Sequence, residues 1–440
     1  MVFNRHSNIS MNEQRVHMEK ESNTINHCLR YLLSDPKNKE FASPCDRGTG
    51  CHTHDQVCTD CLESIDVFDI FLDILNKAHD DSVANKEPES MRLRRMIEQI
   101  QLSKNCVMEY RMHQIRSFAS ELDRKEILES LQPKEALIVL DFALKIIPTG
   151  SVEVQSAWYE KAGISYHMSY CVANLDGSLY HHSFGHTADD LKQDSIAVSA
   201  ITEHVLRQVK ENGVEKVYLR SDNAGCYHNA AYLSTLFQLS KLIGIEILGY
   251  LFSEAQSGKG DADREISHSK RKIRDYVDAK GNARNANEIV KALCAPTLLK
   301  ATSFHEIIVN PISISKSSFP GITSYGSFRF EATGIKARKY DINGDGHFID
   351  EKKMFRNEYS YKFGLQGGIQ SKEIGYWKKF EDDDDKEVEN TDELGEDPLK
   401  LKKEGIFCCS DRLCISVFLT QWKGKTRLQS GAQKEEEFGV

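Results

Sequence analysis

The 440-residue chain lacks any long apolar run, and no stretch approaches the roughly 18 consecutive apolar residues of a membrane span. Residues 1–20 are polar and lack the apolar segment of a signal peptide. Tryptophan and proline are scarce, with 3 and 9 residues, but 20 Phe and 16 Tyr can supply a sizeable core. An apolar fraction of 40% excludes a chain that is disordered throughout. We therefore expect a soluble intracellular protein, outside the membrane, of two to four domains at roughly 100–200 residues each.

The chain has twelve cysteines, which in a reducing compartment are thiols or metal ligands more often than disulfides. A Cys/His cluster occupies 45–61, and its Cys58-x2-Cys61 pair is half of a tetrahedral zinc site. The ligands we prefer are Cys45, His54, Cys58 and Cys61, with Cys51 and His52 as alternatives. Free surface thiols or an incomplete site are the other interpretation of this cluster.

The net charge of −9 is unevenly distributed along the chain. Residues 381–397 contain eleven carboxylates and one lysine, which leaves the remainder with a net charge of +1. We expect the acidic segment to be a disordered linker. A body near neutrality can still approach phosphate, so the overall charge does not exclude nucleic acid as a partner.

The chain divides into six regions that differ in residue composition. We predict a polar, partly disordered lead (1–40), a Cys/His zinc-binding and helical region (41–132), a strand–helix core (136–293), a β-rich extension (294–379), an acidic linker (380–406) and a cysteine-bearing tail (407–440). The helix predicted at 91–131 is long enough to pair with a second copy of the chain, which would make a homo-oligomer. Its spacing drifts from a clean heptad, so packing on its own domain is the alternative.

The sequence pattern of the core region (136–293) predicts three strands followed by alternating helices and strands. The expected strands and helices are a β-rich run at 137–144, a hairpin of 164–173 with 178–184, a helix at 191–211, a strand at 216–220, a helix at 229–242, a strand at 245–252 and a helix from 261. This βββαβαβα order is that of the ribonuclease H-like fold, a mixed α/β sheet. Right-handed crossovers would place the strand containing Asp141 beside the strand that ends at Asp222.

Three aspartates then fall at one edge of the predicted sheet, namely Asp141, Asp222 and Asp263. Carboxylates from distant points in the sequence can hold two divalent ions ~4 Å apart, as Mg²⁺- or Mn²⁺-dependent phosphodiester cleavage requires. Asp141 lies inside an apolar strand, where a carboxylate is costly unless it is paired or bound to metal. A pairing with Lys145 or with turn amides is its alternative interpretation.

The other two aspartates also have structural alternatives. Asp222 could form an Asx turn or cap a helix. Asp263 competes with Asp261 and Glu265, because the helix dipole favours any acidic residue in a first turn.

Basic residues accompany the third aspartate, and we predict contacts to a DNA backbone from Lys259, Arg264, Lys270 and Arg274. The spacing along the predicted helix brings Lys270 and Arg274 to one face. A solvated helix face is the alternative. The short basic run around 270–274 also suggests nuclear import, and so a nuclear location.

Four motifs carry a family resemblance, and together they span about 137–276. They are VLDFALK (139–145), QSAWYEKAG (155–163), SDNAGCYH (221–228) and GKGDADR (258–264). At these residues the chain resembles transposon-derived proteins of invertebrate genomes that have a DDE-type, ribonuclease H-like transposase core. The resemblance implies a catalytic triad of Asp141, Asp222 and Asp263, with Asp261 as the rival third member. It does not decide between an active enzyme and a domesticated or inactive one.

Two further motifs are incomplete. Cys409-x4-Cys414 resembles the first half of a C2H2 finger, but the last histidine of the chain is His347, so we expect a degenerate finger. The sequence from Asp341 starts like an EF-hand loop, yet Lys352 stands where a bidentate glutamate is needed. We disfavour calcium there and expect a turn.

The sequence thus predicts a transposase-like protein that cleaves DNA or transfers its strands with Mg²⁺. A non-catalytic, zinc-stabilised DNA-binding or interaction protein is the alternative.

Overall fold

The computed structural model describes most of the chain between residues 31 and 380. The described residues are 31, 33–35, 37–43, 59–85, 89–153, 159, 161–189, 191–254, 260–295, 299–309, 319–341, 344–354, 365–366 and 377–380. Contacts divide the chain into two compact units. The first comprises Met1–Cys61 with Tyr110–Phe380, and the second comprises Leu62–Glu109 with Glu381–Val440.

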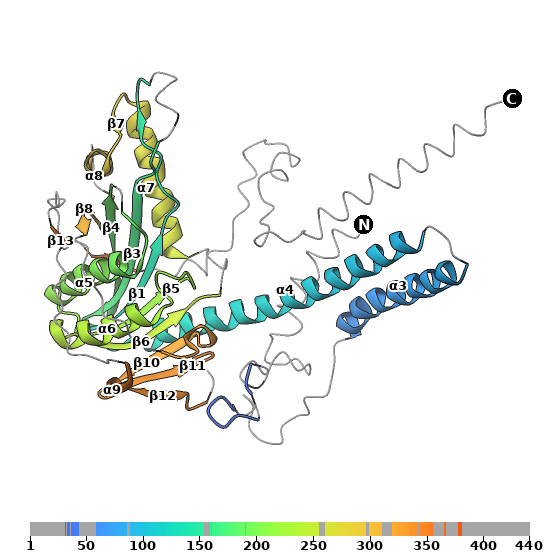
Figure 1. Ribbon diagram of the computed structural model, residues 1–440. Coiled ribbons are helices and arrows are strands. Elements are labelled where there is room, and N and C mark those ends of the chain that lie inside the picture. The colour runs from blue at the N-terminus through green and yellow to red at the C-terminus, as the bar shows by residue number, and fades with distance from the viewer. Residues whose placement is uncertain are drawn as a thin grey trace. The chain divides into compact units, whose positions relative to one another are not determined.

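Two long helices supply the described part of the second unit, and the second of them was predicted at 91–131. They are α3 (Thr59–Ala84) and α4 (Ser90–Ser130), and α4 continues into the first unit (Figure 1). Lys104 Nζ of α4 lies 2.5 Å from Asp69 Oδ1 of α3, so the two helices contact each other within one chain. This contact supports packing within the chain for this part of α4, and pairing with a second copy stays a prediction. No helix in the described ranges combines the length and apolarity needed to cross a bilayer.

A mixed sheet forms the centre of the first unit. Its five central strands follow the order β4-β3-β1-β5-β6. These are β1 (Glu135–Phe142), β3 (Ser165–Leu175), β4 (Ser178–Ala188), β5 (Lys216–Ser221) and β6 (Glu246–Phe252). Strands β4, β3 and β1 are antiparallel neighbours, whereas β1, β5 and β6 run parallel. The predicted placement of the Asp141 strand beside the strand that ends at Asp222 is confirmed.

Residues of the predicted β-rich extension join this sheet at both sides. At the β6 side, β10 (Ser327–Glu331), β11 (Gly334–Arg338) and β12 (His347–Asp350) add antiparallel strands. At the β4 side, β8 (Thr302–Glu306) and β14 (Lys378–Lys379) pair with β4. The short elements that remain are β2 (Thr149–Gly150), β7 (Asn282–Ala283), β9 (Ile308–Val309), β13 (Leu365–Gln366), η3 (Ile322–Ser324) and α9 (Glu351–Met354).

The tight turn between β3 and β4 is the predicted hairpin. Asp176 and Gly177 both have positive φ, 54° and 83°, as a type I′ two-residue hairpin turn requires. Asn174 Oδ1 accepts a hydrogen bond of 3.0 Å from the Gly177 amide. The hairpin fixes the register of β3 against β4 and so positions the antiparallel half of the sheet.

Four helices pack against the core strands in two layers. They are α5 (Ser195–Glu211), α6 (Ala230–Ile243), α7 (Asp261–Asp278) and α8 (Ala286–Cys294). Helices α5 and α6 begin at side-chain caps, because Asp194 accepts from the Ile196 amide at 3.0 Å and Asn229 from the Tyr232 amide at 2.9 Å.

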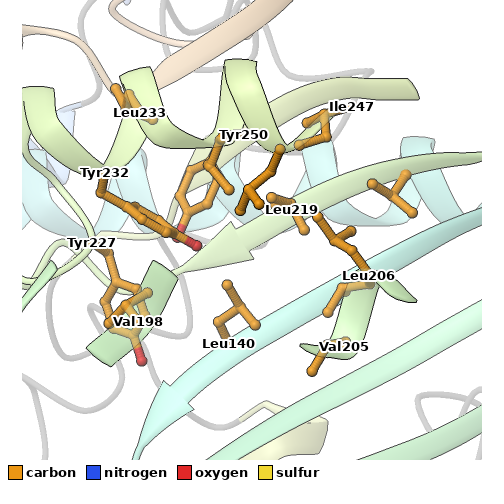
Figure 2. Close-up of a cluster of buried hydrophobic side chains, with 14 of the residues drawn as sticks. Leu140, Val198, Val205, Leu206, Leu219, Tyr227, Tyr232, Leu233, Ile247 and Tyr250 are labelled. Carbon is orange, nitrogen blue, oxygen red and sulfur yellow. The ribbon is translucent and has the colours of Figure 1, made fainter. Parts of the chain in front are cut away.

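The alternation of side chains along β1 separates the two cores. Ile138 and Leu140 pack with residues of α5 and α6, whereas Leu137 packs with residues of α7 and α8. Figure 2 shows Leu140 among apolar side chains that include Leu206 of α5 and Leu233 of α6. With both faces covered by helices, the sheet offers the ends of its parallel strands as the place for a site.

Candidate active site

The carboxyl ends of β1 and β5 lie side by side. Leu140 pairs with Ser221 in the parallel register of these strands, so Asp141 and Asp222 each follow a paired residue at the same edge. Helix α7 starts at Asp261, after β6, which is the neighbour of β5. The structure therefore brings elements from three distant parts of the sequence to one edge of the sheet.

Asp141 is in electrostatic contact with both other members of the predicted triad. Burial, the negative charges of Asp263 and Asp222, and a hydrogen bond with Asp263 together raise the pKa of its carboxyl to about 7. Lys270 opposes the shift. A hydrogen bond between two carboxyl groups requires one proton, which the raised pKa places on Asp141.

Asp222 has a structural role as well. Its Oδ1 accepts a hydrogen bond of 3.1 Å from the Ala224 amide, which is the Asx turn expected as an alternative. Burial raises the pKa of Asp222, the Ala224 amide opposes this, and the charge of Asp263 adds to the rise. The turn fixes one oxygen of Asp222 and leaves its carboxylate within the field of the other aspartates.

The structure distinguishes the two rivals for the third position. Asp261 Oδ1 lies 2.5 Å from Arg264 Nη2, and Asp261 Oδ2 lies 3.7 Å from Arg124 Nη1. Asp261 is therefore neutralised by two arginines, whereas Asp263 bonds to Asp141. Asp263 also accepts from the Gly260 amide at 3.4 Å, which holds it at the start of α7.

The predicted DNA-contacting residues have different environments. Lys270 acts on Asp141, and Arg274 lies one helical turn further along α7 and is exposed. Arg264 is paired with Asp261. Lys259 lies outside the described residues. The pairing of Asp141 with Lys145, considered from the sequence, is not among the ion pairs of the described residues, and Lys145 is exposed.

The donor set at this edge suits a hard divalent cation, because carboxylate oxygens are the ligands that Mg²⁺ and Mn²⁺ prefer. In the arrangement shown, however, a proton joins Asp141 and Asp263. As they stand, no three His, Cys, Asp or Glu side chains of the described residues form a group that could hold a metal ion. The residues fit a divalent ion by type and by their mutual repulsion, which a cation would relieve.

The predicted zinc ligands lie almost entirely outside the described residues. Cys61 is in α3, but its side chain is not described. The other candidates outside the described part are Cys45, Cys51, His52, His54, Cys58, Cys409 and Cys414. The zinc site and the degenerate finger therefore stay predictions.

The segment that begins like an EF-hand engages its first carboxylate elsewhere. Asp341 accepts hydrogen bonds from Arg329 Nε at 2.9 Å and from Ser327 Oγ at 2.8 Å. Burial alone would raise the pKa of Asp341, but Arg329 outweighs it and the pKa is lowered. Strand β12 starts at His347, within the span of the loop. Asp341 therefore forms an ion pair with Arg329 of β10.

Two features of the first unit were missed by the sequence analysis. The first is a group of buried imidazoles, in which His186 Nε2 lies 3.0 Å from His204 Nδ1 and His305 stacks on His186. Burial lowers the pKa of His204 to about 4 and that of His305 to about 3, so these rings pack as neutral aromatic groups. Their strands and helix are far apart in sequence, and no local spacing signals the group.

The second missed feature surrounds Arg220, the penultimate residue of β5. Its guanidinium is buried and donates to the Ser120 carbonyl of α4 at 2.7 Å and to Ser120 Oγ at 3.2 Å. Arg220 thereby fixes α4 beside the strand end that leads to Asp222. An arginine at the end of an apolar strand was the available signal.

Comparison with known proteins gives little functional information. Residues 124–317 match a family described as "Domain of unknown function (DUF8701)". No curated protein matches the chain. One solved structure, "Crystal structure of NurA bound to dAMP and manganese", is 12% identical with a TM-score of 0.12, over 41% of this chain and 39% of that chain. At that score the likeness carries no argument, and the match spans well under half of the solved chain.

Proposed function

We propose that this chain is a DDE transposase-like protein that cleaves DNA phosphodiester bonds, or transfers DNA strands, with Mg²⁺ or Mn²⁺. The observation that carries the proposal is the electrostatic contact of Asp141 with both Asp222 and Asp263. Like charges are costly to gather at a half-buried edge unless a cation or a proton compensates them. The DNA substrate also suggests a nuclear location.

The strand order supports a ribonuclease H-like fold as part of the proposal. Three antiparallel strands, β4, β3 and β1, are followed by two parallel strands, β5 and β6, with helices between them. This arrangement puts the aspartates at the carboxyl ends of β1 and β5, where α/β sheets commonly bind ligands.

Each aspartate has a defined part in the proposed chemistry. When bound, divalent ions activate the attacking oxygen and stabilise the leaving oxygen. Asp141 and Asp222 supply oxygen ligands from adjacent strands, and Asp263 supplies a third from α7. Lys270, whose charge acts on Asp141, would attract the phosphate that approaches the cluster.

One observation favours the non-catalytic alternative, a zinc-stabilised protein that binds DNA or another partner. The hydrogen bond between Asp141 and Asp263 satisfies both carboxyl groups without a cation. That alternative predicts DNA binding that does not depend on Mg²⁺.

A nicking assay on supercoiled DNA tests the proposed function. With Mg²⁺ or Mn²⁺ present, Asp141→Asn and Asp222→Asn should each lower the nicking rate by a factor on the order of 100 or more, because a metal ion contributes several kcal/mol of transition-state stabilisation. Asp275→Asn, at an exposed position of α7, is the matched control and should nick at the wild-type rate. Nicking that is equal in the wild type and in both aspartate variants would remove the enzymatic claim.

A further inference from the structure

A cleft opens beside the aspartate cluster, and the proposed chemistry does not use it. Its volume is 180 Å³, and its wall includes parts of α4, the residue after Asp222, the end of β6 and the segments 323–327 and 339–341. Asn223 connects the cleft with the cluster, since it lines the cleft and directly follows Asp222. Ser253, also in the wall, donates from its amide to the Ser221 carbonyl at 2.8 Å. The cleft and the aspartates therefore share one edge of the sheet.

Asp123 of α4 lies in the wall of the cleft. It is only 7% exposed, and within the described part of the chain it receives no hydrogen bond and forms no ion pair. Other charged groups of the wall are engaged, because Arg116 lies 2.7 Å from Glu254 and Asp341 binds Arg329. The carboxyl oxygens of Asp123 are not among the fully buried polar atoms of the described residues, so they are open to the cleft and available to a ligand there.

The electrostatics around Asp123 determine its protonation. Burial and the charges of Asp341 and Glu126 together raise the pKa of its carboxyl to about 7, although Arg220 and Arg329 oppose the rise. Near neutral pH the carboxyl group is therefore both a hydrogen-bond donor and an acceptor.

The rest of the wall combines aromatic faces with an amide. Phe252, Tyr325 and Tyr340 line the cleft. The Asn223 side chain contacts His228 Nδ1, and His228 Nε2 is 2.9 Å from the Ile322 carbonyl oxygen, so a fixed imidazole holds the amide in place. Phe252 already stacks on His228, so a flat ligand with donors and acceptors at its edge would contact Tyr325 and Tyr340. Its edge would bond to Asp123 and Asn223.

The mixture of charges argues against simple ions. Glu254 and Asp341 disfavour a bare anion, and Arg116 and Lys339 disfavour a bare cation. A neutral heterocycle with polar edges is repelled neither by the carboxylates nor by the basic side chains. Nucleobases have this chemistry, and proteins read an unstacked base by stacking and by hydrogen bonds to its edge.

We propose that this cleft binds the nucleobase of a nucleotide drawn out of a DNA strand, with Asp123 and Asn223 reading the edge of the base. The inference rests on the proposed function, because a DNA strand at the three aspartates would bring a base to the neighbouring cleft. It adds a substrate determinant that is separate from phosphodiester chemistry.

Binding of single deoxynucleosides to the full chain tests this inference. Saturation-transfer NMR and calorimetry without divalent ions should show that at least one of the four deoxynucleosides binds. Asp123→Leu should weaken that binding roughly tenfold, since it removes a buried hydrogen-bonding partner. Asn223→Ala should weaken it as well, whereas Asp123→Asn, which keeps a donor and an acceptor, should stay closer to the wild type. Deoxyribose 5-phosphate is the control ligand without a base.

The inference is overturned if no deoxynucleoside binds, if deoxyribose 5-phosphate binds as tightly, or if folded Asp123→Leu and Asn223→Ala variants both bind like the wild type. Thermal melting establishes that the variants are folded. The nicking assay separates the two proposals. Nucleoside binding that depends on Asp123 in a chain that does not nick DNA would remove the proposed function and support the base site. Nicking without such binding would remove the base site alone.

Discussion

Asp141 at the end of β1 and Asp263 in the first turn of α7 are joined by a hydrogen bond between their carboxyl groups. This contact requires a proton, which the raised pKa places on Asp141, and Asp222 adds a negative charge beside it. The edge of the sheet therefore stores electrostatic repulsion that a divalent cation would relieve. The functional account depends on this relationship.

The identity of the third carboxylate can be tested by paired substitutions. Asp263→Asn should lower Mg²⁺-dependent nicking on the order of 100-fold, because it removes an oxygen ligand beside Asp141. Asp261→Asn should change nicking far less, since Asp261 is bound by Arg264. Rates measured for both variants on the same DNA decide the point. A larger loss in Asp261→Asn would reverse the assignment.

Stability should depend on pH through Asp141. Its pKa is raised from 3.8 to about 7 in the folded protein, so the folded state holds a proton that the unfolded state has lost between these values. The free energy of unfolding therefore falls as pH rises from about 4 to 7. Asparagine does not titrate, so the stability of Asp141→Asn does not fall in this way as pH rises. The variant should be more stable than the wild type at pH 8 by roughly 1–3 kcal/mol.

Denaturant unfolding at pH 8 and pH 4 measures this difference, which should shrink on acidification. Mn²⁺ should raise the melting temperature of the wild type but not of Asp141→Asn. If the difference in unfolding free energy between Asp141→Asn and the wild type were the same at both pH values, the raised pKa of Asp141 would be excluded.

Arg220 should be the main anchor between β5 and α4. Arg220→Ala removes the buried guanidinium that donates to the Ser120 carbonyl and should lower the free energy of unfolding by about 3 kcal/mol. Arg220→Lys should recover only part of this, because lysine lacks the planar fork of donors. Arg207→Ala breaks a partly exposed i,i+4 pair with Glu203 and should cost less than about 1 kcal/mol. Equal losses in Arg220→Ala and Arg207→Ala would contradict the anchoring role.

The basic face of α7 should contribute to DNA affinity through phosphate contacts. Lys270→Ala and Arg274→Ala should each reduce the slope of log affinity against log salt by about 1. Lys216→Ala is the control and should leave the slope unchanged. It breaks the pair with Glu246 at the amino-terminal ends of β5 and β6, away from the aspartates. Fluorescence anisotropy over a salt series provides the measurement. An unchanged slope in both α7 variants would remove this helix from the DNA interface.

The sequence was sufficient for the parallel placement of Asp141 and Asp222. Apolar runs defined their strands, and the handedness of crossovers made those strands neighbours. It was not sufficient to choose between Asp261 and Asp263, because both lie in the first turn of α7 and the helix dipole favours either one. The ion pairs of Asp261 with Arg264 and with Arg124 of α4 show which carboxylate is already neutralised.

The cleft was beyond sequence reasoning for the same physical reason. Asp123 has no unusual neighbours along α4, and its isolation arises from burial against residues such as Asp341 that are distant in sequence. The extension of the sheet at β6 by β10 also depends on long-range pairing, for which Phe328 opposite Tyr250 gives no local signal. Such contacts follow from tertiary packing, so spacing alone does not reveal them.

The most direct test of the central claim is a crystal structure of the full chain soaked with Mn²⁺, with anomalous scattering used to locate the metal. The account predicts divalent ions bound by the carboxylates of Asp141, Asp222 and Asp263, with the hydrogen bond between Asp141 and Asp263 replaced by metal ligation. Anomalous density absent from this edge at saturating Mn²⁺, with the carboxyl groups of Asp141 and Asp263 still in contact, would contradict it.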